Sequence, residues 1–428
     1  MTTKQIQPAR SVSGAVMVPG DKSISHRYGM LASIAEGASK IANYSTGADC
    51  QSTLRCMQAL GVPMEQQDGI LLVHGQGLNG LRPPAGPLDA GNSGSTIRLL
   101  SGILAAQAFT SEIGGDESLS RRPMERIMKP LAQMGADVTA REGRFPPLTI
   151  AGRPLHTIDY TLPVASAQVK SCVLFAGLFC EGGTIVRESI ATRDHSEVAL
   201  REFGADVEVI KRTITLTGRP RLQGKELTVP GDLSSAAFFL VAALIVQSSN
   251  LVIRGVGMNP TRSALLDFLA EMGAELKILE ISETGGELIG DVQVRKTRVV
   301  RGGTLEGART AALIDEIPVL AVLGAASENG LVVRDAAELR VKETDRIATI
   351  ADNFARMGLR IDVRPDGFTV PGKQQFHAAE LDSFGDHRIA MAFAVAALAA
   401  DGPCSIQNAE AASVSFPEFY DTLARVAE

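Results

Sequence analysis

The sequence contains no tryptophan, and aromatic residues make up only 4% of its 428 residues. Proteins that bind single-stranded nucleic acids stack bases on aromatic side chains, and nucleic-acid-binding domains usually carry a basic face. Here 48 aspartates and glutamates outnumber 42 lysines and arginines, so the formal net charge is -6. The composition therefore argues against a nucleic-acid-binding protein.

Long hydrophobic runs are also missing. The longest, IAMAFAVAALAA and AAFFLVAALIV, are shorter than the roughly 20 residues that cross a membrane as a helix. We expect both to form buried helices instead. The opening segment MTTKQIQPAR lacks the apolar stretch of a signal peptide. We therefore expect a cytoplasmic protein that does not bind membranes.

The cysteines are few and show no ligand spacing. There are five, an odd number without any CxxC pair, and the six histidines form no HExxH motif. This pattern favours free thiols in the core and a reducing compartment over disulfides or metal ligands. We expect neither a metal site nor a cofactor.

An internal repeat is the main signal of domain organisation. The repeated phrase consists of a large apolar residue, a glycine, a small residue and a charged residue. It follows an amphipathic helix, which the glycine ends, and it precedes a strand of alternating apolar and polar residues. Upstream lies a segment that is apolar on nearly every face, which is typical of a helix inside a domain. The glycines of the phrase are Gly61, Gly135, Gly204, Gly273 and Gly358. The apolar segments are MLASIAEG, IRLLSGILAAQA, VKSCVLFAGLFC, AAFFLVAALIV, PVLAVLGAAS and IAMAFAVAALAA.

These six apolar segments predict six copies of one unit: polar turn, buried helix, strand, half-buried helix, and a further strand or hairpin, with the last copy shortened. A chain of 428 residues is too long for one core, so we predict two α/β domains of three units each. The boundary is placed where VPGDLSSAAFF echoes VPGDKSISHR. The first domain then comprises 1–20 and 233–428 and the second 21–232, with hinge crossings near 20 and 232.

Polar and cationic residues lead into several of the apolar helices. Lys22, Ser23 and Arg27 follow one glycine turn, and Arg388 follows another, in GDHRIAM. Glycines and free N–H groups at a helix start favour a bound anion. For the turn GNSGS, which contains Gly94, a plain Ser or Asn cap is an equally good interpretation. The recurrence of such turns nevertheless predicts one cleft for a substrate with several negative charges.

Further charged stretches fit the same interpretation. Arg121 and Arg122 precede Pro123, a residue favoured at a helix start, although a solvated basic face explains them equally well. In VASAQVKS, Ser166, Gln168 and Lys170 are candidate anion-binding groups, as is Arg193 in ATRDHS.

In LRVKETDRI, a continuous helix would place Lys342 and Arg346 on one face with Glu343 beside them as an acid or base. The alternative is an exposed ion-pair ladder worth about 0.2–0.5 kcal/mol per pair. At the place where other units have a cation leading into a buried helix, LIDEIPVLAV instead offers Asp315 and Glu316.

Together, GDKSISHR, GNSGSTIR, RRPM, SAQVKS, LRVKETDR and GDHRIAM resemble the signatures of the 5-enolpyruvylshikimate-3-phosphate synthase family, from about residue 10 to about residue 425. The resemblance implies the enolpyruvyl transferase fold, an inside-out α/β barrel with two domains of three βαβαββ-type units. It also implies transfer of the enolpyruvyl group of phosphoenolpyruvate to the 5-hydroxyl of shikimate 3-phosphate. Shikimate 3-phosphate and phosphoenolpyruvate are then the partners of a monomer without cofactor.

The resemblance also implies roles for individual residues. Asp315, Glu343 and Lys22 are the implied catalytic groups, with Asp315 as the base and Lys22 or Glu343 as the acid. His26 is left with a structural role. The implied ligands of shikimate 3-phosphate are Lys22, Ser23, Arg27, Ser166, Ala167, Gln168, Arg193, Asp315 and Lys342. Those of phosphoenolpyruvate are Lys22, Gly94, Arg122, Gln168, Arg346 and Arg388.

Some positions depart from one large subclass of the family and resemble its other bacterial subclass. Ala167 replaces a serine, Glu338 replaces an asparagine, and Val414 replaces a lysine that contacts phosphoenolpyruvate, while Arg193 lies in a different loop sequence. The family is the target of the herbicide glyphosate, and the room left at Gly94 predicts sensitivity.

The sequence disfavours three other functions. UDP-N-acetylglucosamine enolpyruvyl transferase is disfavoured because GGDESLSRRPM has no cysteine and GDKSISHR replaces a GAKNA-like motif. A P-loop needs glycine directly before the lysine, where this chain has Asp21. A non-catalytic binding protein is disfavoured because the acid, base and cation set is complete.

Overall fold

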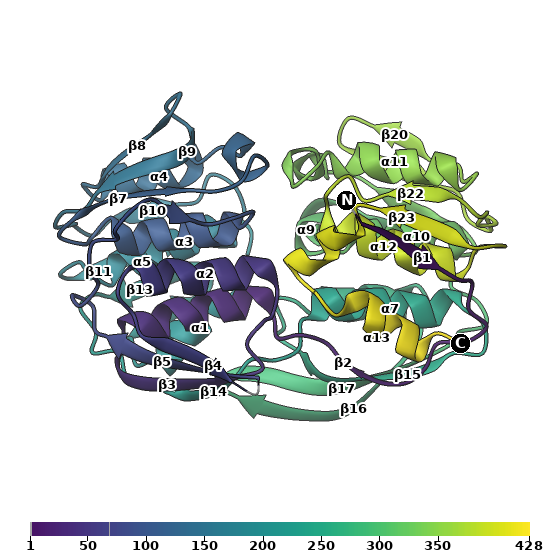
Figure 1. The fold of residues 1–428 in the computed structure, drawn as a ribbon, viewed down its shortest axis with the longest axis horizontal. Helices are drawn as coiled ribbons and strands as arrows, with labels where there is room; N and C mark the ends of the chain where they lie inside the picture. The colour runs from purple at the N-terminus through teal and green to yellow at the C-terminus, as the bar shows by residue number, and fades with distance from the viewer. Residues whose placement is uncertain (1, 68) are drawn as a thin grey trace. The chain divides into compact units, whose positions relative to one another are not determined.

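The computed structural model describes residues 2–67 and 69–428, and it divides into two compact units (Figure 1). Unit 1 contains the residues up to Pro19 together with Pro230–Glu283 and Leu288–Glu428. Unit 2 contains Gly20–Val229 and the short segment Thr284–Glu287. The sequence indicated boundaries at 20 and 232 but gave no sign that 284–287 belongs with unit 2.

The described residues of unit 2 form three sheets with one shared pattern. The first strand of each sheet is parallel to the second, which pairs antiparallel with one strand of a hairpin. In spatial order the strands are β14 (Glu226–Thr228), β3 (Glu36–Ala42), β5 (Ile70–Gln76) and β4 (Met64–Gln67); β6 (Leu88–Asp89), β7 (Thr110–Gly114), β9 (Phe145–Ala151) and β8 (Asp137–Arg141); and β10 (Asp159–Thr161), β11 (Gly183–Arg187), β13 (Thr213–Thr217) and β12 (Val207–Ile210).

Unit 1 repeats this pattern twice in full, and its third sheet is shortened to three strands. That shortened sheet belongs to the sixth repeat, which the sequence predicted to be incomplete. In spatial order the strands are β2 (Ser13–Met17), β15 (Asn250–Gly257), β17 (Glu287–Arg295) and β16 (Glu275–Thr284); β18 (Gly303–Leu305), β19 (Leu331–Val333), β21 (Gly367–Val370) and β20 (Asp362–Arg364); and β22 (Glu380–Asp382), β23 (Cys404–Gln407) and β1 (Thr3–Ile6).

Each of the six predicted apolar segments forms a buried helix. In unit 2 these are α1 (Lys22–Ile34), α3 (Gly94–Leu104) and α5 (Ala167–Gly177), and in unit 1 they are α7 (Leu233–Ile245), α10 (Ile317–Ala326) and α12 (His387–Leu398). The half-buried helices are α2 (Ala48–Ala59), α4 (Glu125–Gln133), α6 (His195–Glu202), α8 (Ala264–Glu271) and α11 (Arg346–Arg356). The remaining helical segments are α9 (Gly307–Ala312), α13 (Phe419–Val426), η1 (Leu119–Arg121), η2 (Ala337–Val341) and η3 (Ala409–Val414).

The first strands of two repeats are exchanged between the units. β2 directly precedes α1 of unit 2, yet it pairs with β15 in unit 1. Conversely, β14 precedes α7 of unit 1 but pairs with β3 in unit 2. The chain therefore changes units between a strand and the helix that follows it, which is why both crossings fall in the VPGD turns.

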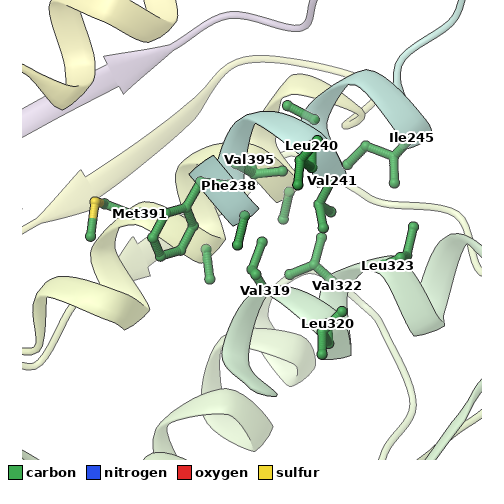
Figure 2. Packing of buried hydrophobic residues seen from close by; sticks show 14 of the residues in the cluster. Phe238, Leu240, Val241, Ile245, Val319, Leu320, Val322, Leu323, Met391 and Val395 are labelled. Carbon is green, nitrogen blue, oxygen red and sulfur yellow. The ribbon is translucent and has the colours of Figure 1, made fainter. Parts of the chain in front are cut away.

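Apolar helices fill the interior of each unit. Every residue of α7 and α12 is buried. Figure 2 shows side chains of α7, α10 and α12 pointing toward one another, with Phe238, Val319, Met391 and Val395 among them. In unit 2, α3 packs against both α1 and α5. Because burial of one large apolar side chain contributes about 1.5–3 kcal/mol, these helices hold each unit together.

The repeated glycines end the half-buried helices in a left-handed conformation. Gly61, Gly135, Gly204, Gly273 and Gly358 have φ values of 88°, 90°, 99°, 91° and 73°. Each follows the C-cap of its helix by one residue. This conformation costs an L-residue with a side chain free energy, which explains why glycine recurs at this position.

Gly204→Ala tests this backbone requirement. A Cβ at Gly204 would meet only the carbonyl oxygen of Arg221, at an ordinary 3.6 Å, so the penalty arises from the backbone alone. We expect the free energy of unfolding to fall by roughly 1–2 kcal/mol, as measured by thermal or denaturant unfolding. Gly86→Ala is the control, since Gly86 has open space around it and no positive φ. Equal stability of both variants would contradict the interpretation.

Candidate functional site

The starts of the buried helices in unit 2 are capped by polar side chains. Asp21 Oδ1 accepts a hydrogen bond from the Ile24 amide at 3.0 Å. Ser93 Oγ accepts from the Thr96 amide at 3.0 Å, and Ser166 Oγ accepts from the Val169 amide at 3.4 Å. The cap interpretation of the GNSGS turn is therefore confirmed, and capping leaves other N–H groups of these first turns available to an anion.

Hydrogen bonds bring the starts of α3 and α5 together. Gln168 at the start of α5 accepts from Arg98 Nη1 at 2.7 Å and donates to Ser95 Oγ at 2.9 Å. Both partners lie in the first turns of α3. Since a helix start carries a partial positive charge, the N-terminal ends of two helices and one arginine converge at this point.

The turn before α3 is bracketed by two guanidinium groups. Arg122 donates from Nη2 to Asn92 Oδ1 at 2.8 Å and to Ser118 Oγ at 3.1 Å. A Cβ placed on Gly94 would lie 2.8 Å from Arg98 Nη1 and 3.5 Å from Arg122 Nη1. Because Gly94 has no side chain, two cations approach this helix start closely, which suits a phosphate or carboxylate.

The two arginines of the RRPM motif have different environments. Arg122 is buried, whereas Arg121 is exposed and pairs with Glu117. Pro123 is not the first residue of a helix as predicted, because Leu119–Arg121 forms a separate 3₁₀ turn and α4 begins at Glu125.

Lys22 and Arg27 occupy different depths of α1. The ammonium of Lys22, in the first turn, is 2.9 Å from Asp49 Oδ2. Arg27 is buried and donates to Ser196 Oγ, Ser171 Oγ and the carbonyl oxygen of Ser23, each at 2.7 Å.

Burial lowers the pKa of Arg27 to about 10, so it remains charged at neutral pH. Arg193, half-buried in the loop before α6, is close enough to contribute to this lowering of the Arg27 pKa. Arg27 is thus buried one turn further along α1 than Ser23.

Lys170 does not belong to this polar end, contrary to the prediction. Its side chain is fully buried, 3.0 Å from Glu188 Oε1 and 2.7 Å from Glu197 Oε1. The sequence placed it with Ser166 and Gln168 because all three are within one turn of α5. Helix geometry turns the Lys170 side chain toward α6 instead.

In unit 1 a carboxylate lies among three cations. Asp315, just before α10, has Oδ1 at 3.7 Å from both Lys342 Nζ and Arg346 Nη1. Its Oδ2 is 4.0 Å from Arg388 Nη2, and its backbone oxygen accepts from Arg388 Nη1 at 2.9 Å. Nearby cations favour the ionised form of a carboxyl group.

Arg346 is the buried centre of this cluster, with a side chain only 1% exposed. It donates to Asp386 Oδ2 at 2.8 Å and to Glu343 Oε2 at 2.6 Å. Burial alone lowers the pKa of Arg346, but the charges of Asp386, Glu343 and Asp315 outweigh it and raise the pKa above its usual value. Arg346 Nη1 is buried and has no hydrogen-bond partner among the described residues, and Asp315 Oδ1 lies 3.7 Å from it.

The predicted continuous helix over LRVKETDRI is wrong. The 3₁₀ turn η2 ends at Val341, and α11 begins at Arg346 because Asp345 Oδ1 caps it by accepting from the Ala348 amide at 3.1 Å. Lys342 and Arg346 therefore do not share a helix face. They come together through Asp315 instead.

Sequence reasoning missed Arg262, a buried arginine just before α8. Its Nη2 donates to Ser234 Oγ at 2.5 Å and lies 3.4 Å from Asp232 Oδ1. Its Nη1 is 3.9 Å from Glu316 Oε1. The repeat contained a signal for it, because Arg122 and Arg193 stand just before α4 and α6, and Arg346 is the first residue of α11.

The remaining predicted positions lie near these helix starts or in flanking turns. Ser23 and Ala167 are half-buried in the first turns of α1 and α5. Glu338 is exposed in η2, and Val414 is half-buried in η3. All five cysteines are free and buried, as expected. Among the described residues, no group of three metal-ligating side chains was found, and no helix is long and apolar enough to span a membrane.

Comparisons with known proteins define the class and then the family. The enolpyruvyl transferase NikO from Streptomyces tendae shares the fold, with a TM-score of 0.79 at 19% identity over 99% of this chain and 97% of that chain. A solved EPSP synthase from Acinetobacter baumannii matches with a TM-score of 0.89 at 42% identity, over 99% of this chain and 98% of that one. The fold is thus that of an enolpyruvyl transferase.

The sequence comparisons are more specific. The family model of EPSP synthase (3-phosphoshikimate 1-carboxyvinyltransferase) matches residues 6–423. The 3-phosphoshikimate 1-carboxyvinyltransferase of Solibacter usitatus is 66% identical over 99% of this chain and 100% of its own length. The chain belongs to the EPSP synthase family. It is an enzyme that transfers the enolpyruvyl group of phosphoenolpyruvate to shikimate 3-phosphate, a step of aromatic amino-acid biosynthesis.

His26→Gln tests a structural role for His26. This side chain is buried, with Nδ1 2.7 Å from Thr53 Oγ1. Burial first, and then the charges of Lys22 and Arg27, lower its pKa well below 6.5. The folded protein therefore binds fewer protons than the unfolded chain as the pH falls below 6.5, and stability is lost. Between pH 6.5 and 5 we expect the wild type to lose up to about 1.4 kcal/mol per pH unit more than the variant in unfolding experiments.

His74→Gln is the matched control, because His74 is exposed on β5, and it should keep the pH dependence of the wild type. If His26→Gln also kept that dependence, the assignment would be wrong.

Proposed function

We propose that the polar ends of the buried helices in both units act on the same two substrates. The observation that carries the proposal is the convergence of a helix start, Arg98 and Arg122 at Gly94. Shikimate 3-phosphate and phosphoenolpyruvate both carry phosphate, and phosphoenolpyruvate also carries a carboxylate. Groups of this kind are bound by helix N-termini and by arginine forks.

The phosphoenolpyruvate ligands are assigned to both units. In unit 2, Gly94 offers room and amide groups, and Arg122 supplies a guanidinium. In unit 1, Arg346 offers the buried Nη1 atom that has no hydrogen-bond partner among the described residues. Gln168, Lys22 and Arg388 complete the proposed set.

Shikimate 3-phosphate is assigned mainly to the starts of α1 and α5. Ser23 and Ser166 supply hydroxyl groups in or next to first helical turns, and Arg193 supplies a cation from the loop before α6. Ala167 and Gln168 follow Ser166 on α5. The other proposed ligands are Lys22, Arg27, Asp315 and Lys342.

Asp315 is the proposed base that removes the proton of the 5-hydroxyl. Lys342, Arg346 and Arg388 lie 3.7–4.0 Å from its carboxylate oxygens. Nearby cations favour the ionised form of a carboxyl group, which is the form that accepts a proton.

Lys22 and Glu343 are the candidates for the second proton transfer. One of them protonates the methylene carbon of phosphoenolpyruvate, and the 5-oxygen bonds to the neighbouring carbon to give a tetrahedral intermediate. The intermediate then loses phosphate, and a methyl proton returns to the enzyme, which restores the double bond. Lys22 is held by Asp49 and Glu343 by Arg346, so both are fixed before substrate arrives.

A coupled assay tests the overall proposal directly. Purified protein should release inorganic phosphate only when shikimate 3-phosphate and phosphoenolpyruvate are both present. UDP-N-acetylglucosamine should not replace shikimate 3-phosphate. Phosphate release with the nucleotide sugar instead would reverse the assignment of the acceptor.

We also propose that the enzyme works as a monomer in the cytoplasm. Five reduced, buried cysteines support a reducing compartment. Light scattering at working concentrations would give a mass near 45.2 kDa for the monomer.

Lys22→Met tests the catalytic assignment. Lys22 lies in the first turn of α1 with 19% of its side chain exposed, so its loss leaves the core unchanged. We expect kcat to fall at least about a hundredfold, as for the loss of a general acid, with thermal unfolding close to that of the wild type. Near-normal turnover would exclude Lys22 from the site.

Gly94→Ala tests the space beside the two arginines. The added methyl group would come within 2.8 Å of Arg98 Nη1 and fill the proposed position of phosphoenolpyruvate. Glyphosate should inhibit the wild type in competition with phosphoenolpyruvate, and the variant much less. The KM for shikimate 3-phosphate should change less than the inhibition constant. An unchanged inhibition constant would contradict this placement.

A further inference from the structure

The loop between β11 and α6 carries Arg193, and one buried lysine, Lys170, pairs with a carboxylate at each end of it. Glu188 is the first residue after β11, and Glu197 lies in the first turn of α6. The ammonium of Lys170 is 3.0 Å from Glu188 Oε1 and 2.7 Å from Glu197 Oε1. The Lys170 side chain of α5 therefore forms ion pairs at both ends of the loop.

The contacts of Glu188 also reach Thr192, the residue next to Arg193. Glu188 Oε1, which faces Lys170, also accepts hydrogen bonds from the backbone amide of Thr192 at 3.2 Å and from its hydroxyl group. The position of Arg193 along the loop thus depends on Glu188, and the position of Glu188 depends on Lys170.

Burial makes this arrangement rigid. Lys170 is 0% exposed, and the side chains of Glu188 and Glu197 are 6% and 3% exposed. Two carboxylates buried together repel each other unless a cation lies between them. A buried ion pair of this kind is not needed for stability alone, because apolar residues of similar volume often serve as well or better.

The neighbouring side chains tie the same elements together. Ser171, next to Lys170 on α5, and Ser196, next to Glu197 on α6, both accept hydrogen bonds from Arg27. The start of α6 is therefore tied to α5 and to α1 at adjacent positions. Both ends of the loop that carries Arg193 are therefore held by contacts with α5, and the end at α6 also by contacts with α1.

We propose that Lys170 is a positioning residue for the shikimate 3-phosphate subsite, because it holds both ends of the loop that presents Arg193. This inference rests on the proposed role of Arg193. Lys170 itself has no contact with solvent or substrate, and it acts through Glu188 and Glu197.

Steady-state kinetics of two variants test the inference. Lys170→Met removes the ammonium and keeps the side-chain length. Lys170→Met combined with Glu188→Gln and Glu197→Gln also removes both carboxylates, so no buried charge is left without a partner. For each folded variant we expect the KM for shikimate 3-phosphate to rise about tenfold or more. The KM for phosphoenolpyruvate and kcat should change much less.

Lys225→Met is the matched control. It makes the same substitution in unit 2 at a partly exposed lysine, 4.0 Å from Glu202, and it should leave all kinetic constants unchanged. A rise in the KM for shikimate 3-phosphate in this control equal to that in Lys170→Met would overturn the inference.

Arg193→Ala separates this inference from the proposed function. If Lys170 acts through Arg193, adding Lys170→Met to Arg193→Ala raises the KM for shikimate 3-phosphate no further. If Arg193→Ala raises this KM but the Lys170 variants do not, the inference is wrong and the subsite assignment stands. If Arg193→Ala leaves the KM unchanged, the assignment of Arg193 fails and the inference with it. If neither Lys170 variant folds, Lys170 is a structural residue and the inference is also overturned.

Discussion

The structure depends on one constraint: six apolar helices are buried, yet the first N–H groups of every helix need polar partners. The chain meets it in five of these helices with capping side chains, such as Asp21, Ser93 and Asp386, and in α10 with a proline in the first turn. These polar first turns also carry a partial positive charge, which makes a helix start a place where anions bind.

The acidic balance of the chain agrees with this arrangement. Cations gathered at helix starts repel one another, and two of them lie beside carboxylates: Lys22 beside Asp49, and Arg346 beside Asp386 and Glu343. These pairs keep the side chains in place without substrate. An anionic substrate can then bind to groups that are already oriented, which limits the entropy lost on binding.

The sequence predicted those features that depend on local chemistry. The six helices follow from unbroken apolar runs, and the left-handed glycines after α2, α4, α6, α8 and α11 follow from the repeated phrase. The crossings expected near 20 and 232 already placed β2 with the first domain and β14 with the second, but their pairing partners β15 and β3 could not be predicted, because strand pairing is set by contacts distant in sequence. The break before Arg346 was missed because Asp345 is as compatible with a helix surface as with a cap.

The depth of a cation along a helix could not be predicted either. Each buried helix of unit 2 carries a cation about one turn inside its start: Arg27 in α1, Arg98 in α3 and Lys170 in α5. One turn is about 5.4 Å, and at this depth Arg27 and Lys170 are buried, whereas Arg98 is half-buried. There these cations bond to neighbouring helices and loops, as Arg98 does to Gln168 and Arg27 to Ser171. In the sequence, the residues at a helix start and the cation one turn further along belong to one polar motif. In the structure, the cations one turn along hold the residues at the helix starts in position.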